Sequence, residues 1–303
     1  MHWILIALIP PLLWSLLNHV DKYLISKYAG HTGIGGLAIF SSAFAVVALP
    51  IVYIIDNTIF SISVPDAFFL SVTGILTAFG ILFYLYALDR DDASHVVPFW
   101  FLIPIFSYVL GVIVLGEYIV FDKILGSLIT LIGALILSLE FDQGFRVKKA
   151  AAFFMIASSL VFAVNYVLFK DIALGVSFWQ SIFWNQVGMF IFGAAAVLFV
   201  KSYRQDFIRM IKANTKQLVI LNTIGESVQM IAVFVNYYVL LIAPIALVSL
   251  IEYTFQPLFV FIEGILLTIF LPHISKEKIS YGHILQKLLS IIVMALGVYL
   301  IMI

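Results

Sequence analysis

The sequence predicts an all-α integral membrane protein with ten transmembrane helices, arranged as two inverted five-helix repeats. Three observations lead to this fold class: the composition, a series of long apolar runs, and a similarity between the two halves. Of the 303 residues, 64% are hydrophobic and 11% are charged, whereas a soluble domain carries about 25% charged residues. The composition therefore excludes a soluble enzyme and a disordered chain.

The net charge and the absence of cysteine exclude further classes. The formal net charge is zero, so no basic field attracts nucleic acid, and we expect no nucleic-acid partner. The chain has no cysteine, which excludes disulfides, thiolate metal sites and thiol catalysis. We expect neither a metal nor a cofactor.

The apolar runs are long enough to cross a hydrocarbon core of roughly 30 Å as helices. Strands of a membrane barrel would alternate between polar and apolar residues. These runs are continuously apolar, and a helix satisfies all of its own backbone groups in lipid. The predicted spans are 3–25, 33–55, 66–88, 94–115, 120–140, 149–171, 175–200, 215–241, 244–270 and 284–303.

Short polar breaks separate these spans. They fall at 56–57, at the acidic cluster 89–92, at 142–144 and at a longer polar loop over 201–216. The first span has no basic region before it, and Lys22 and Lys27 follow it, which is unlike a cleaved signal peptide. We therefore expect the first span to remain in the protein.

The lysines and arginines predict an orientation. When the loops are assigned alternately to the two sides, only Lys123 and Lys170 fall on the side opposite the other basic loop residues. Cytoplasmic loops carry an excess of lysine and arginine. We therefore expect a multi-pass cell-membrane protein, by default in a bacterial inner membrane, with both termini outside.

The two halves of the chain resemble each other at matching intervals. Aligning 93–111 with 246–264 pairs Ala93 with Ala246 and Pro104 with Pro257. The same alignment pairs Phe106 with Phe259 and Gly111 with Gly264, a second alignment of 124–139 with 288–303 pairs Gly133 with Gly297, and Asn18 corresponds to Asn165. The alternative is chance similarity between apolar helices. We predict repeats over 1–144 and 145–303.

Five helices per repeat would insert the second repeat in the opposite direction to the first. Inverted repeats are typical of secondary transporters, which expose a site near the membrane midplane alternately to each side. The repeat pattern therefore favours a transporter.

Several motifs resemble the EamA module of the drug/metabolite transporter superfamily. They are Tyr86-Ala87-Leu88, Ala93-Ser94, Pro104 with Gly111, Leu115-Gly116-Glu117, Gly126 with Gly133, and Trp14, Asn18 and Lys22, with Asn165 and Lys170 as second-half counterparts. The resemblance implies a ten-helix metabolite transporter or exporter that works by alternating access. Ser15 departs from the glycine common in the family, and the second half has Thr268-Ile269-Phe270 in place of Leu-Gly-Glu. We therefore expect Glu117 to make a local contact at the end of a helix or in a loop.

Polar residues inside the predicted spans are the candidate site. A central charge in a transmembrane helix costs about 2.5–3.5 kcal/mol on insertion scales, so such a side chain faces a cavity or a partner. The eighth span carries Asn222, Glu226, Gln229 and Asn236 on one face, and the ninth carries Ser249, Glu252, Gln256 and Glu263. The alternative role is a hydrogen bond between helices.

The prolines and tryptophans add to this set. Pro257 and Pro104 remove the hydrogen bonds to the carbonyls of Tyr253 and Trp100, which predicts either a mobile bend or a fixed kink. The predicted substrate-binding residues are Trp14, Asn18, Trp100, Asn165, Trp184, Asn222, Glu226, Gln229, Glu252 and Gln256. Asn18 and Asn165 have the alternative role of locking helices together.

The sequence therefore favours a secondary transporter, as an exporter, of a small polar or amphipathic metabolite such as an amino acid. Glu226 or Glu252 could carry a proton, because a buried carboxyl exchanges protons nearer neutral pH. Cationic drugs or polyamines are the alternative substrates, and a lipid flippase remains open. An intramembrane enzyme is disfavoured, because the cluster at 89–92 lacks the second acidic cluster of a Mg²⁺-diphosphate site. The expected partners are the substrate, protons and membrane lipids, and we expect a monomer or a weak homodimer.

Overall fold

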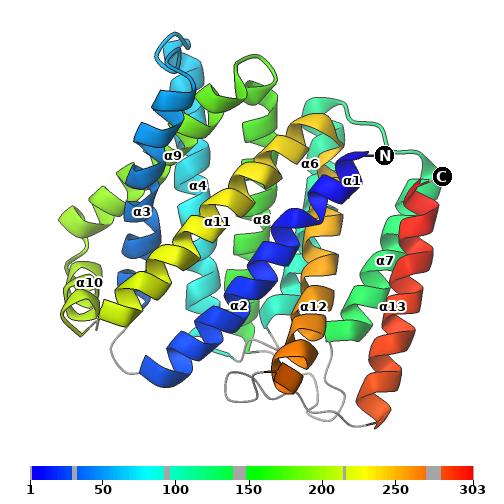
Figure 1. The fold of residues 1–303 in the computed structure, drawn as a ribbon. Coiled ribbons are helices and arrows are strands. Elements are labelled where there is room, and N and C mark those ends of the chain that lie inside the picture. Colours follow the sequence, from blue (N-terminus) through cyan, green and yellow to red (C-terminus); the bar gives the residue numbers. More distant parts are fainter. Residues whose placement is uncertain are drawn as a thin grey trace. The chain divides into compact units, whose positions relative to one another are not determined.

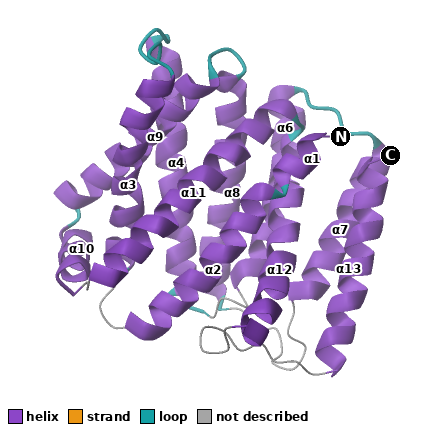
Figure 2. Ribbon diagram, in the orientation of Figure 1, coloured by secondary structure: helices purple, strands orange, loops and turns teal. Residues whose placement is uncertain are grey.

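The computed structural model describes residues 2–28, 33–91, 96–138, 148–213, 216–270 and 281–302, and every regular element in them is a helix (Figure 2). The all-α prediction is confirmed for these residues. The elements are α1 (His2–Ala7), α2 (Ile9–Tyr28), α3 (Ile34–Ile55), α4 (Val64–Leu88), the 3₁₀ helix η1 (Val97–Phe101), α6 (Leu102–Leu115), α7 (Phe121–Ser138), α8 (Lys149–Ala173), α9 (Phe178–Phe199), α10 (Lys201–Ala213), α11 (Lys216–Ile242), α12 (Ile245–Phe270) and α13 (Tyr281–Met302).

Eight stretches of these helices are long and apolar enough to cross a membrane. They are His2–Val20, Ile34–Ile55, Val64–Leu88, Pro98–Leu115, Lys149–Ala173, Phe178–Phe199, Ile220–Ile242 and Ile245–Phe270. The fifth and tenth predicted spans form α7 and α13, which are not among the eight. Ten spans therefore remain a prediction.

Proline shapes the first and fourth spans in different ways. The first span divides at Leu8 into α1 and α2, just before Pro10 and Pro11, which have no N–H to donate. The fourth span begins as η1, which has Pro98 in its first turn, and continues as α6. In contrast, α12 runs through Pro257 as one helix. Pro104, which the repeat alignment pairs with Pro257, lies in the first turn of α6, so the two paired prolines lie in different local structures.

The predicted polar loop at 201–216 is wrong for most of its length, because residues 201–213 form helix α10. Charged residues hide an amphipathic pattern in which Tyr203, Phe207 and Met210 recur at helical spacing. This face packs against α3 and α9. A Cβ added to Gly35 of α3 would lie 2.5 Å from Cα of Tyr203, so the close approach requires glycine.

The helices form two compact units, each built from both halves of the chain. The first unit comprises Met1–Lys27, Ala93–Val147 and Ile231–Ile303, and the second comprises Tyr28–Asp92 and Lys148–Met230. This division follows packing and does not test the predicted repeat boundary between residues 144 and 145.

In the first unit, α7 and α13 lie side by side in opposite directions (Figure 1). A Cβ on Gly126 would lie 2.6 Å from the carbonyl oxygen of Gly297, and a Cβ on Gly133 would lie 3.0 Å from that of Ser290. Residue numbers therefore fall along α13 as they rise along α7. The small residues allow close backbone packing, as is common between membrane helices.

In the second unit, α4 packs against both α8 and α9. A Cβ on Gly74 would lie 1.9 Å from the carbonyl oxygen of Asn185, and one on Gly188 would lie 1.8 Å from that of Ser71. Any larger side chain at Gly74 or Gly188 would push the two backbones apart.

Candidate functional site

The predicted site residues fall in both units. Trp14, Asn18, Trp100, Glu252 and Gln256 belong to the first unit, and Asn165, Trp184, Asn222, Glu226 and Gln229 belong to the second.

Helix α12 carries several buried polar residues of the first unit. Its first ten residues, 245–254, are all buried. Glu252 is 1% exposed, and Gln256, one turn further on, is also buried. The ring of Trp100 in η1 lies 5.9 Å from that of Tyr253, between centroids. The structure thus places Trp100, Glu252 and Gln256 on or against one buried helix.

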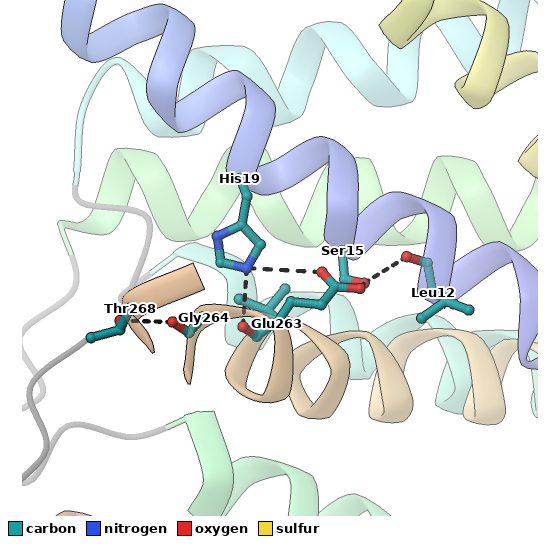
Figure 3. Close-up of polar contacts among 7 residues, drawn as sticks. Leu12, Ser15, His19, Glu263, Gly264 and Thr268 are labelled. Atoms are coloured by element: carbon teal, nitrogen blue, oxygen red, sulfur yellow. Dashed lines mark hydrogen bonds and ion pairs between the residues drawn. The ribbon is translucent and has the colours of Figure 1, made fainter. Parts of the chain in front are cut away.

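A second polar cluster on α12 joins it to α2 (Figure 3). The Ser15 hydroxyl lies 2.8 Å from Oε1 of Glu263 and 2.7 Å from the Leu12 carbonyl oxygen. Nε2 of His19 lies 3.1 Å from the Val260 carbonyl oxygen and 3.9 Å from Oε2 of Glu263. Sequence reasoning placed Glu263 in a polar stripe but missed His19, although Ser15 and His19 are one helical turn apart in an apolar run.

Trp14 and Asn18 do not join this cluster. Asn18 is exposed and Trp14 is half-buried, whereas Ser15 and His19 are buried. Because neighbouring positions on a helix point in different directions, the buried face of α2 is the one that carries Ser15 and His19.

In the second unit, Glu226 on α11 pairs with α3. Its Oε1 accepts a hydrogen bond from the Ser41 hydroxyl. Asn222 and Gln229, on the same helix, are half-buried. Glu226 thus has a polar neighbour on another helix, as a carboxyl group in a membrane span requires.

Asn165 forms a hydrogen bond between helices. Its Nδ2 lies 3.2 Å from Oγ1 of Thr77 on α4, and Asn165 is 1% exposed. One turn earlier on α4, Oγ1 of Thr73 accepts from Nδ2 of Asn185 at 2.8 Å. These contacts support the alternative role of Asn165, in which it holds helices together.

Trp184 ties α9 to the segment that follows α3. Its indole N–H donates to the Ile59 carbonyl at 3.1 Å, and its ring contacts Phe60 and Phe183. Near the start of α9, Nε2 of Gln180 donates to the Thr58 carbonyl at 2.9 Å. Trp184 therefore contributes to holding a helix connection in place.

Asp56 belongs to the same connection and lies outside the membrane-spanning helices. Its carboxylate accepts hydrogen bonds from the hydroxyl and the backbone N–H of Thr58 and from the hydroxyl of Ser177. These donors lower the pKa of the Asp56 carboxyl, with the Thr58 hydroxyl making the largest contribution.

Glu117 makes the end-of-helix contact expected of it. Gly116 ends α6 in the left-handed conformation, with φ of 62°. The Glu117 carboxylate then accepts the backbone N–H of Ile245, the first residue of α12, at 3.0 Å. An acidic group at a helix N-terminus satisfies a free N–H and interacts favourably with the helix dipole.

Several histidine and lysine side chains are not described. His95 lies outside the described residues, as do the side chains of Lys22 and Lys27. Within the described ranges, no group of three or more histidine or acidic residues is placed to hold a metal ion.

A comparison with protein families finds a match in the first part of the chain. The model of the EamA-like transporter family matches residues 1–139. The match covers 139 of the 303 residues. This family belongs to the drug/metabolite transporter superfamily and contains transporters, not enzymes. Together with the eight apolar helices, the match supports a multi-pass membrane transporter.

The remaining comparisons are with curated protein sequences and with solved structures. No curated protein matches the sequence. A crystal structure of a protein with 16% sequence identity matches 99% of this chain and 97% of its own length, with a TM-score of 0.68. At that identity, the likeness shows the fold alone.

Proposed function

We propose that the protein is a secondary transporter that exports a small polar or amphipathic metabolite, such as an amino acid, by alternating access. The observation that carries this proposal is the set of carboxyl and amide groups within apolar helices of an EamA-like protein, above all Glu252 with Gln256 and Glu226. Such groups in a membrane span are functional candidates by default, because burying them in lipid is costly. Alternating access requires a hydrated substrate site near the membrane midplane.

The contact between α7 and α13 supports two inverted repeats. The sequence alignment pairs Gly126 with Ser290 and Gly133 with Gly297. In the structure, Gly126 contacts Gly297, and Gly133 contacts Ser290. Each glycine thus contacts the residue that is paired with the other glycine, and such reciprocal contacts are the pattern that a twofold axis produces. The opposite directions of α7 and α13 fit an axis in the membrane plane.

Further helix pairs fit the same arrangement. The second and seventh predicted spans form α3 and α9, which pack together, and the fourth and ninth form α6 and α12, which also pack together. A twofold axis brings equivalent helices into contact in this way. We infer ten spans in repeats 1–144 and 145–303, with both termini outside.

The residue types favour a substrate with both apolar and polar parts. Trp100 beside Tyr253 offers an aromatic surface, while Gln256 and Glu252 offer hydrogen-bonding groups that would orient an ammonium group. The two acidic groups, Glu252 and Glu226, equally suit cationic drugs or polyamines, which are the second candidate substrates.

Transport by purified protein in vesicles tests the proposal. A thermal-shift screen would first select ligands from amino acids, polyamines and cationic drugs, because a ligand that binds the folded state raises its melting temperature. We expect the selected compound, radiolabelled, to exchange across proteoliposomes but not across empty vesicles. A labelled phospholipid in the same vesicles is the control for a flippase. Lipid scrambling without exchange of any soluble compound would contradict the proposal.

A further inference from the structure

The cluster of Ser15, His19 and Glu263 places two acceptor oxygens within hydrogen-bond distance of the single Ser15 hydroxyl. The Ser15 hydroxyl has one proton, yet its oxygen lies within hydrogen-bond distance of both the Leu12 carbonyl, at 2.7 Å, and Oε1 of Glu263, at 2.8 Å. A carbonyl oxygen and an ionised carboxylate only accept. One proton shared between two acceptors would make two bent and weaker bonds, so two oxygen pairs at these short distances favour a second proton.

A neutral carboxylic acid at Glu263 supplies that proton. The acid O–H donates to the Ser15 oxygen, and the Ser15 O–H then donates to the Leu12 carbonyl. Both short distances become normal hydrogen bonds between oxygens. If Glu263 were ionised, the single Ser15 proton would leave one of the two oxygen pairs in contact without a hydrogen between them.

The position of His19 agrees with a neutral Glu263. Its Nε2 lies 3.1 Å from the Val260 carbonyl, which can only accept, so Nε2 carries a proton that points at this carbonyl. The 3.9 Å from Nε2 to Oε2 of Glu263 exceeds hydrogen-bond distance. Among the described residues, Oε2 is buried without a hydrogen-bond partner, which costs less for the C=O of a neutral acid than for a carboxylate.

Other titratable groups lie on the helices that pack against α12. They are His2 on α1, Tyr108 on α6, and Asp122 and Lys123 on α7, with Glu252 and Tyr253 on α12 itself. Lys287 of α13 lies 5.0 Å from the ring of Phe261 and donates to the Leu137 carbonyl. The side chains of α2 from Asp21 onward are not described. Within the described part of the chain, His19 is the ionisable group recorded within ion-pair distance of Glu263.

We propose that Glu263, with Ser15 and His19, is a proton-binding site that joins α2 to α12, and that its proton drives the transport cycle. Binding adds one proton from water to the Glu263 carboxylate, and release returns it to water. The protonated form makes the Ser15 bridge, so it stabilises the arrangement seen here. Release removes one of the two hydrogen bonds and leaves a charge among apolar helices, which shifts the population toward another conformation. The coupling role rests on the proposed function, whereas the protonation of Glu263 does not.

Infrared titration tests the protonation directly and requires no substrate. We expect the wild-type protein at neutral pH to show the C=O band of a protonated carboxyl, and we expect Glu263→Gln to remove it. The glutamine is a conservative replacement, because its amide N–H donates to Ser15 as the acid does. Glu252→Gln and Glu226→Gln are the matched controls. Loss of an ionised carboxylate signal on Glu263→Gln, with no loss of the acid band, would overturn the protonated site.

A pH gradient across proteoliposomes tests the coupling. We expect the gradient to accelerate transport by the wild-type protein, and Glu263→Gln to transport equally fast with and without it while retaining substrate exchange. Accelerated transport by Glu263→Gln would overturn the coupling role. If instead the wild-type protein carries none of the screened compounds but shows the acid band of Glu263, the proposed function fails and the proton site stands.

Discussion

Two serine–glutamate pairs, one in each unit, contain the same residues but differ in their surroundings. Ser15 has two acceptors, Glu263 and the Leu12 carbonyl, whereas Ser41 is recorded with one, Glu226. Ser41 can therefore donate its only proton to an ionised Glu226. The second acceptor at Ser15, rather than the residue pair, is what favours a protonated glutamate there, and Ser41 has no such second acceptor recorded.

The largest expected difference between the two pairs is in substrate exchange without a pH gradient. Glu226→Gln should lower exchange about tenfold or more, because a hydrogen bond with a charged group contributes about 1.5–3 kcal/mol. Glu263→Gln should leave exchange near the wild-type rate, since the replacement resembles the protonated acid. Radiolabel counterflow in proteoliposomes measures both. Equal losses in the two variants would show that the glutamates do not differ in charge.

The next effect concerns stability. Ser41→Ala removes the donor to an ionised carboxylate, so we expect a loss of about 1.5–3 kcal/mol in the free energy of unfolding. Ser15→Ala removes bonds between neutral groups, and we expect about 0.5–1.5 kcal/mol. Denaturant unfolding in the same detergent gives both values. A greater loss for Ser15→Ala would reverse the assigned charges.

The smallest effect is expected at Asp56, a carboxyl group in contact with water. Its donors lower its pKa in the folded protein, so its contribution to stability is present above the unfolded pKa of about 3.9. That contribution is lost as the pH falls through the lower folded value. Asp56→Asn should therefore lower the melting temperature slightly at neutral pH and have less effect in strong acid. A destabilisation that grows toward low pH would contradict this assignment.

The sequence predicted the helices well, because the length of an apolar run determines whether it can span a membrane. It missed α10, where lysines and arginines on the exposed face concealed the apolar spacing of Tyr203, Phe207 and Met210. It also did not predict that η1 precedes α6 while α12 continues through Pro257. Whether a proline interrupts a helix depends on how that helix packs against its neighbouring helices, and a single amino-acid sequence does not give this packing.

The site was predicted less completely than the fold. The sequence singled out Glu226 and Glu252 because acidic residues in apolar spans are conspicuous. It treated Ser15 as a departure from a family glycine and passed over His19, since neither residue has a distinctive spacing. Their importance comes from Glu263, more than 240 residues away in the chain, and only the folded structure brings these side chains together.

The glycine contacts between α4 and α9 have a mechanical consequence. Gly74 of α4 lies against the backbone of α9, and Gly188 of α9 lies against the backbone of α4, so no layer of adaptable side chains separates the two helices at these points. We therefore expect helices α4 and α9 to move together as one rigid body during the transport cycle. A disulfide engineered between them should leave turnover intact, and any rearrangement during the cycle must occur at looser helix contacts.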